Sequence, residues 1–203
     1  RAVDAKNVAL AVREFGFVDT EKVFVVGHSQ GGWIVQVALA NYPEIFAGGI
    51  SMAGPVFGVR KQLVNDYQSK FICEKGFSEN KAFRKAKAKT NRIIFFSSML
   101  GRKGNLKQLH VIKNFEARPY LLSLRKPLLL LFAENDELVN SKWCIDDLKA
   151  IFPDGSPPVM EVYEAKGQTH SFKIAPACYK GERVTRYYSD ATRQKIYEWT
   201  IAV

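Results

Sequence analysis

The pentapeptide Gly27-His28-Ser29-Gln30-Gly31 is the first feature of the sequence with the residue types for catalysis. A short apolar and β-branched run, residues 22–26, precedes it, and helix-forming residues follow it without a spacer. A serine in a sharp turn between a buried strand and a helix has a strained backbone that lifts its hydroxyl above the sheet, as a nucleophile requires. The alternative is a glycine-rich nucleotide-binding turn, but the spacing differs from G-x-G-x-x-G and there is no G-K-[ST] segment.

A serine hydroxyl becomes a good nucleophile only when a base removes its proton and a carboxylate orients that base. The sequence contains three histidines that are candidates for the base: His28, His110 and His170. His28 lies inside the pentapeptide, His110 lies in a basic middle stretch, and His170 follows an expected strand. A histidine in a loop is ordinarily a surface residue, so the residues alone leave the choice of base open.

Candidate carboxylates gather where the apolar run 128–133 ends. Glu134, Asp136 and Glu137 follow this run, and the helix expected next carries Asp146 and Asp147. Each is able in principle to orient a histidine. The residues alone leave the choice among them open.

The elements that position these residues alternate between buried strands and helices. Apolar residues at near-helical spacing predict a first helix over residues 3–15, which Gly16 ends. Strands are expected over residues 22–26, 46–53, 128–133 and 159–165, and further helices over 33–41, 143–152 and 190–201, the last capped by Asp190. This alternation predicts an α/β fold with a parallel sheet and right-handed crossovers.

Residues 55–126 interrupt the alternation and show no strand pattern. Amphipathic spacing predicts one helix around residues 63–71 and another from Ser78 toward Leu100. Residues 60–126 hold 17 Lys and Arg against 4 Asp and Glu. We interpret this charge as a solvated helical surface, with an anion-attracting surface as the alternative. Because no nucleic-acid-binding motif accompanies it, no nucleic acid partner is expected.

Composition indicates one globular domain with an insertion. The chain has 203 residues, 47% hydrophobic and 25% charged, with a net charge of +10. No apolar run reaches the roughly 20 residues of a transmembrane helix. Because the sequence begins at Arg1 and shows no signal peptide, we expect it to be an excerpt of a longer protein. Cys73, Cys144 and Cys178 lie far apart and are expected to be free thiols, and no metal site or cofactor is expected.

The segment from Val25 to Gly32 resembles the serine elbow of the α/β-hydrolase superfamily, and the resemblance extends over residues 1–54 and 127–203. Ser51-Met52-Ala53-Gly54-Pro55 is similar to the esterase and dienelactone-hydrolase branch. The resemblance implies a mostly parallel sheet with helices on both faces and a helical cap insertion over residues 55–126. It implies that the first strands of the superfamily sheet are absent from this chain.

The resemblance also implies roles for individual residues. Ser29 would be the nucleophile, and the chain order Ser, Asp or Glu, His selects Asp136 as the acid and His170 as the base. Glu134 is the second choice for the acid, and Glu137, Asp146 and Asp147 are expected to be solvated. Ala133 stands where the superfamily usually has glycine.

The implied activity is that of a serine hydrolase which cleaves a carboxylic ester of a small molecule through an acyl-enzyme intermediate. The Gln30 N–H would be one oxyanion donor, and the second belongs to a loop after an earlier strand, outside this chain. His28, Phe95 and Phe96 are expected to contact the substrate, although the two phenylalanines are equally expected in the core of the cap. Acyl-CoA thioesterases or acyltransferases, prolyl-type peptidases and a non-catalytic binding protein are the alternatives.

Overall fold

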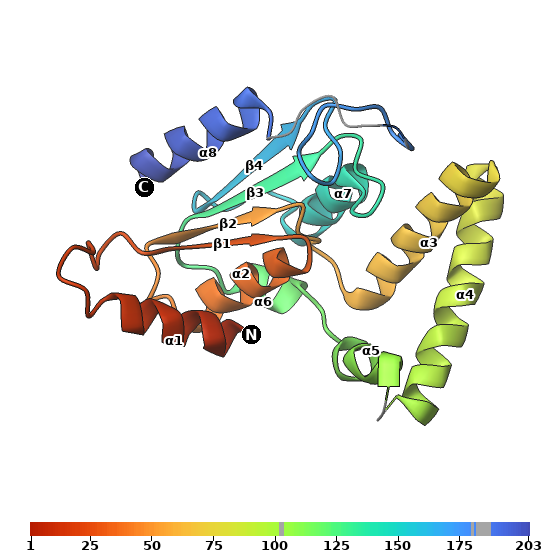
Figure 1. The fold of residues 1–203 in the computed structure, drawn as a ribbon, viewed down its shortest axis with the longest axis horizontal. Helices are drawn as coiled ribbons and strands as arrows, with labels where there is room; N and C mark the ends of the chain where they lie inside the picture. Colours follow the sequence, from red (N-terminus) through yellow and green to blue (C-terminus); the bar gives the residue numbers. More distant parts are fainter. Residues whose placement is uncertain (102–103, 180, 182–187) are drawn as a thin grey trace.

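A four-stranded parallel sheet forms the centre of the chain (Figure 1). The computed structural model describes residues 1–101, 104–179, 181 and 188–203. The strands lie in the order β1-β2-β3-β4, and their bounds are Phe24–His28 for β1, Gly48–Met52 for β2, Leu128–Ala133 for β3 and Met160–Ala165 for β4. Every neighbouring pair is parallel, which confirms the predicted sheet. The sheet is open, with β1 and β4 at its two edges.

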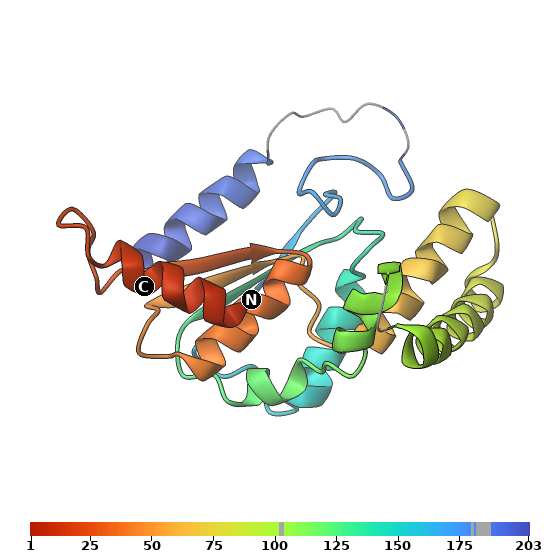
Figure 2. The same ribbon diagram turned by 60° about the horizontal axis from the view of Figure 1, so that its bottom comes forward.

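Helices cover both faces of the sheet (Figure 2). One face carries α1 (Ala2–Val12), α2 (Gln30–Asn41), α6 (Arg118–Leu122) and α7 (Ser141–Ile151), and the other carries α8 (Asp190–Ala202). Because side chains alternate along a strand, Leu128 and Leu130 of β3 face the first group, whereas Leu129 and Leu131 pack with Trp199 of α8. All of β3 is therefore buried.

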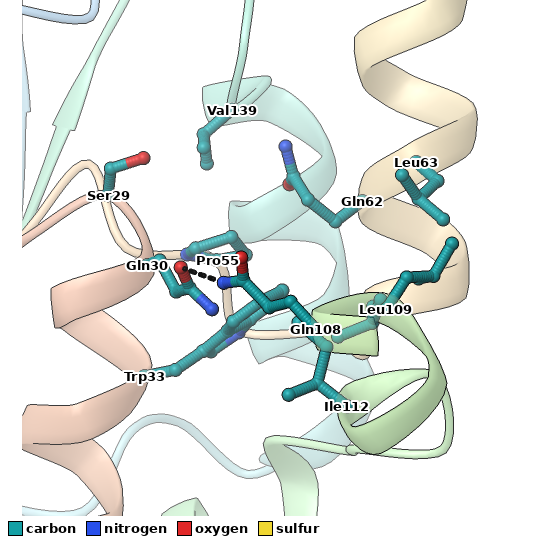
Figure 3. Close-up of a pocket in the computed structure, with 11 residues that line it drawn as sticks. Ser29, Gln30, Trp33, Pro55, Gln62, Leu63, Gln108, Leu109, Ile112 and Val139 are labelled. Carbon is teal, nitrogen blue, oxygen red and sulfur yellow. Dashed lines mark hydrogen bonds between the residues drawn. The ribbon is translucent and has the colours of Figure 1, made fainter. Parts of the chain in front are cut away.

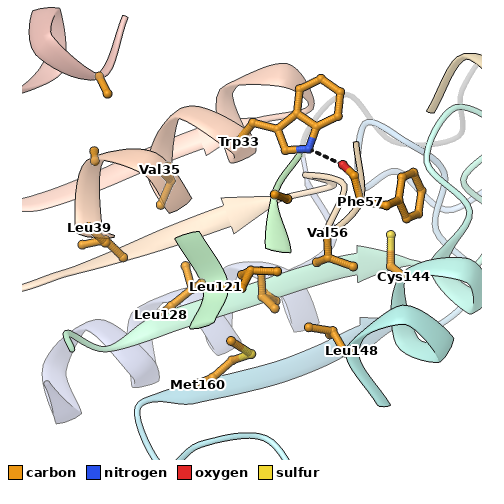
Figure 4. Close-up of a cluster of buried hydrophobic side chains, with 14 of the residues drawn as sticks. Trp33, Val35, Leu39, Val56, Phe57, Leu121, Leu128, Cys144, Leu148 and Met160 are labelled. Carbon is orange, nitrogen blue, oxygen red and sulfur yellow. Dashed lines mark hydrogen bonds between the residues drawn. The ribbon is translucent and has the colours of Figure 1, made fainter. Parts of the chain in front are cut away.

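The larger hydrophobic cluster lies between the sheet and the helices α1, α2, α6 and α7, and it includes Trp33 in the first turn of α2 (Figure 4). Within it, the Trp33 indole N–H donates to the carbonyl oxygen of Phe57 at 3.0 Å, and this bond is buried. It ties the segment after β2 to the first turn of α2. The first turn of α2 directly follows Ser29.

Between β2 and β3, the described residues form four helices and one 3₁₀ turn: α3 (Val59–Lys75), α4 (Glu79–Leu100), η1 (Gly104–Leu106), α5 (Lys107–Ile112) and α6. Figure 1 shows α3 and α4 side by side beyond the carboxyl ends of the strands, with α5 near the end of α4. Near the ends of the predicted cap segment, residues are buried in the larger cluster: Val56, Phe57, Ala117 and Leu121. We use the term cap helices for α3, α4 and α5.

The cysteine prediction is wrong for two of the three residues. Cys73 at the end of α3 forms a disulfide with Cys178, 105 residues later. Only the tertiary fold brings two positions so distant in sequence together. Cys144 is free, and burial raises the pKa of its thiol, so the thiol stays protonated.

The element boundaries differ from the predictions at a few points. The first helix ends at Val12 rather than near Phe15. Ser189, not Asp190, caps α8, because its hydroxyl oxygen accepts the Thr192 N–H at 3.2 Å. The short helices α5 and α6 were not predicted. None of the described helices is long and apolar enough to cross a membrane.

Candidate active site

Ser29 occupies the turn between β1 and α2 in a strained backbone conformation. Its φ of 57° and ψ of −119° place a non-glycine residue in a region that glycine favours. The Ser29 N–H donates to the Met52 carbonyl at 2.8 Å, and the Gly32 N–H donates to the Ser29 carbonyl at 2.9 Å. These bonds to the next strand and within the helix hold the strain in place, as the pentapeptide predicted.

Two glycines make this turn possible by letting backbones approach closely. A Cβ on Gly27 would overlap the Gly31 carbonyl, and a Cβ on Gly32 would overlap the Ser51 hydroxyl and the Gly54 backbone. A Cβ on Gly31 would meet nothing within 4 Å. The crowded helix position is therefore Gly32 rather than Gly31.

His170 and Asp136 form a hydrogen-bonded pair at the carboxyl ends of β4 and β3. The distance from His170 Nδ1 to Asp136 Oδ2 is 2.8 Å, and the two side chains are 14% and 1% exposed. Asp136 Oδ1 accepts the backbone N–H groups of Leu138 and Val139, both at 2.8 Å. Because an ionised carboxylate only accepts, the His170 proton lies on Nδ1, and Nε2 is left as an acceptor.

Glu134 is directed away from this pair. Its carboxylate accepts the Gly167 N–H at 2.8 Å and the Lys166 ammonium at 3.1 Å. The Gly167 hydrogen bond, followed by that of Lys166, holds the pKa of Glu134 below its usual range. The structure therefore brings Asp136, and not Glu134, to His170. The two other helix carboxylates are paired elsewhere, Asp146 with Lys142 and Asp147 with Lys61.

His28 links the Ser29 turn to the His170 loop. Its Nε2–H donates to the His170 carbonyl oxygen at 2.7 Å, and the two imidazole centroids lie 4.6 Å apart. Because His28 directly precedes Ser29, the bond places the two loops side by side. His110 has a different environment in the cap, where its Nδ1 donates to the Ser97 carbonyl at 2.6 Å. The structure thus places His28 and His170 together and keeps His110 in the cap.

A cavity of about 290 Å³ opens beside Ser29 (Figure 3). Ser29 faces it from the sheet side, and Figure 3 shows side chains of α3 and α5 on the opposite wall. Its lining comprises Ser29, Gln30, Trp33, Pro55, Val59, Gln62, Leu63, Gln108, Leu109, Ile112 and Val139. Sequence patterns gave no sign of Gln62 and Gln108, because only the packing of the cap helices brings them here.

Phe95 and Phe96 do not line this cavity. They are 59% and 44% exposed on α4. The buried side of α4 consists of Ala82, Ala86, Thr90, Ile94 and Ser97. The expected apolar lining comes instead from Leu63, Leu109 and Ile112.

The cap helix α3 forms hydrogen bonds with the loop that carries Asp136. Asn65 is 2% exposed, its Nδ2 donates to the Leu138 carbonyl at 2.9 Å, and its Oδ1 accepts the Asn140 N–H at 3.0 Å. Gln62 Nε2 donates to the same Leu138 carbonyl at 2.5 Å. Since Leu138 also donates to Asp136, α3 supports the acid loop directly.

We expect Asn65→Leu to lower the free energy of unfolding by about 2 kcal/mol, because it leaves the part-buried Asn140 N–H without an acceptor. Chemical denaturation of the variant and the parent measures this difference. Asn80→Leu, at an exposed position of α4, is the matched control and should change stability by less than about 0.5 kcal/mol. Equal losses of unfolding free energy in both variants would contradict the role of Asn65 in stabilising the loop that carries Asp136.

Comparisons with known proteins relate the chain to several hydrolases. The model of the prolyl oligopeptidase family matches residues 2–100, just under half of the chain. An esterase of Pyrococcus furiosus is similar in structure, with a TM-score of 0.53 and 16% identity over 99% of this chain and 59% of its own. Est1E of Butyrivibrio proteoclasticus has a TM-score of 0.56 and 16% identity over 100% of this chain and 70% of its own.

A peptidase is among the similar structures. Dipeptidyl peptidase 4 of Porphyromonas gingivalis has a TM-score of 0.56 and 15% identity over 99% of this chain and 22% of its own. No curated protein sequence matches the chain. The chain therefore spans about three fifths of the esterase and a smaller share of the peptidase. At these identities, the likeness is one of fold.

Proposed function

We propose that this chain, which has the α/β-hydrolase fold, belongs to a serine hydrolase that cleaves carboxylic esters of small molecules through an acyl-enzyme intermediate. The observation that carries the proposal is the part-buried Asp136–His170 pair beside the strained Ser29 turn. The hydrogen bond from His28 to the His170 loop supports this placement. No cofactor takes part in the proposed reaction.

The proposed reaction has two steps with the same proton shuttle. Ser29 Oγ attacks the acyl carbon while His170 Nε2 takes its proton, and the alcohol then leaves with that proton. Water attacks the acyl-enzyme, gives a proton to His170, and Ser29 is restored as the carboxylic acid departs. Asp136 remains ionised and stabilises the imidazolium in both steps.

The oxyanion of each tetrahedral intermediate needs donors near Ser29. Gln30 is the first residue of α2, so its N–H has no intrahelical acceptor. The positive end of the α2 dipole lies at the same place. The Gln30 N–H is therefore the proposed donor from this chain.

A substrate panel tests the reaction class on the full-length protein. It compares p-nitrophenyl butanoate, butanoyl-CoA and a prolyl p-nitroanilide peptide by kcat/KM. The proposal expects the ester to be the best substrate. A clear preference for the thioester or the peptide would contradict ester hydrolysis and support thioesterase or peptidase activity instead. No turnover of any compound would favour a non-catalytic binding protein.

A prolyl-type peptidase is the second candidate. The match of the prolyl oligopeptidase family model to residues 2–100 favours it, because this stretch includes the Ser29 turn. The same triad attacks an amide carbonyl by the same steps, with His170 protonating the amine that leaves. The peptide arm of the panel distinguishes the two candidates.

We expect Leu109→Ala to change the preferred acyl length and Phe95→Ala to leave it unchanged. Leu109 lines the cavity beside Ser29, whereas Phe95 is largely exposed on α4. A series of p-nitrophenyl esters with increasing acyl length measures the preference in both variants. A shift caused by Phe95→Ala, with none from Leu109→Ala, would mean that the acyl group binds elsewhere.

A further inference from the structure

The cavity beside Ser29 has an uncharged wall, although the segment that covers it is strongly basic. Each of its lining residues is apolar or an uncharged polar residue. Nearby cations of the cap helices are engaged elsewhere: Lys61 of α3 pairs with Asp147 at 2.5 Å, and Lys113, just after α5, donates to the Ser98 hydroxyl at 2.8 Å. Lys107, the neighbour of Gln108, is not part of the lining. Lys107 lines the adjoining cavity, which shares Gln30, Gln108 and Ile112 with this one. Among the residues that the structure describes, the lining of the cavity beside Ser29 itself thus contains no cation.

Three glutamines from three different elements supply the polar groups of the wall, apart from Ser29 itself. Gln30 begins α2, Gln62 lies on α3, and Gln108 lies on α5. Gln108 Nε2 donates to Gln30 Oε1 at 3.2 Å, and Figure 3 shows this pair bridging from α2 to α5. Gln62 Nε2 donates to the Leu138 carbonyl, and Gln62 Oε1 is buried. Gln30 and Gln108 therefore present the exposed amide groups of the cavity.

The chemistry of this wall disfavours a charged ligand. A carboxylate or ammonium that enters the cavity loses part of its hydration and meets no opposite charge among the described lining residues. An uncharged group with a hydrogen-bond donor and an acceptor has a smaller free-energy cost of entering the cavity. The Gln30–Gln108 pair still has an amide N–H and a carbonyl oxygen that can bond to such a group. The volume of about 290 Å³ lies at the small end for ligand pockets and fits a compact group.

We propose that this cavity selects an uncharged acyl group with a compact apolar body and a hydrogen-bonding polar end, and that Gln108 is the residue that sets this selection. The inference rests on the proposed ester hydrolysis at Ser29. It assigns the acyl side of the substrate to the cavity between α2, α3 and α5. It excludes acyl groups that carry a carboxylate, despite the positive charge of the cap.

Three ethyl esters of nearly equal shape test the selection. Ethyl 4-methylpentanoate ends in a branched hydrocarbon, ethyl succinamate ends in an amide, and monoethyl succinate ends in a carboxylate at neutral pH. Release of the free acid or of ethanol by the full-length protein gives kcat/KM for each ester. We expect the amide ester to be the best substrate and the carboxylate ester to be at least about tenfold poorer than the hydrocarbon ester.

The variant Gln108→Lys tests the assigned residue by a gain of activity. A cation at this position gives the carboxylate a partner, so kcat/KM for monoethyl succinate should rise at least about tenfold, and the amide ester should lose its advantage. Asn80→Lys adds the same charge at an exposed position of α4 outside the cavity and should leave the order of the three esters unchanged. Thermal unfolding of both variants verifies that they are folded.

The possible outcomes distinguish the proposed selection of the acyl group from the proposed ester hydrolysis. Equal turnover of the carboxylate and hydrocarbon esters would overturn the selection and leave ester hydrolysis standing. An unchanged order of esters in folded Gln108→Lys would overturn the role of Gln108. Absence of turnover with all three esters would overturn the proposed hydrolysis, and the selection with it.

Discussion

Ser29→Ala should lower kcat for ester hydrolysis by about 10⁶, which is the loss seen when a serine hydrolase loses its nucleophile. The proposed acyl-enzyme cannot form without the Ser29 hydroxyl, and the cavity beside Ser29 offers no second hydroxyl among its lining residues. The fold should be unchanged, since alanine is small and bears the same backbone strain as the serine it replaces.

Turnover of a p-nitrophenyl ester and thermal unfolding of the same variant measure these two effects. Ser123→Ala is the matched control, because Ser123 is an exposed serine at the end of α6. It should retain the parent rate. A Ser29→Ala protein that also retains a rate near that of the parent would refute Ser29 as the nucleophile.

Asp136→Asn should lower turnover by about 10⁴. The hydrogen bonds of the two Asp136 carboxylate oxygens explain this expected loss. Asp136 Oδ1 accepts two backbone N–H groups, so the asparagine oxygen must take that position, and its NH₂ must face His170 Nδ1. The amide then donates to Nδ1, the histidine proton moves to Nε2, and the base can no longer accept the proton of Ser29.

Glu134→Gln is the matched control for this substitution. Glu134 is exposed and bonded to Gly167 and Lys166, so its neutral analogue should reduce turnover only slightly. The pH dependence of turnover and the rates of both variants are measured with the same ester. A severe loss from Glu134→Gln together with a mild loss from Asp136→Asn would reverse the assignment.

The strand–helix frame was predictable from the sequence because its signals are local. The strands β1 and β3 lie in short apolar runs, although of the described strands only β2 and β3 are buried along their whole length and β1 is an edge strand with partly exposed residues. The serine, acid and histidine follow β1, β3 and β4 in loops that the parallel sheet must bring to one edge. The choice of Asp136 over Glu134 came from the resemblance to a known family. The hydrogen bond from Asp136 to His170 agrees with that choice.

The features that were not predicted depend on how helices pack. The run 93–96 is apolar on all sides, so the sequence does not tell which side of α4 is buried, and Phe95 lies on the exposed one. Asn65 is a polar residue in an amphipathic helix and would be expected at the surface. It is buried instead, and two hydrogen bonds to the loop that carries Asp136 satisfy its side-chain amide. The Cys73–Cys178 disulfide likewise depends on the meeting of α3 with the loop after β4.

Labelling with a fluorophosphonate probe tests the central claim most directly, because the probe reacts only with a serine that an adjacent base activates. The full-length protein is treated with the probe, digested, and the modified peptide is identified by mass spectrometry. Our account predicts a single adduct on Ser29, formed rapidly in the parent and in Glu134→Gln and much more slowly in Asp136→Asn. An adduct on another serine, or no adduct in folded protein, would contradict it.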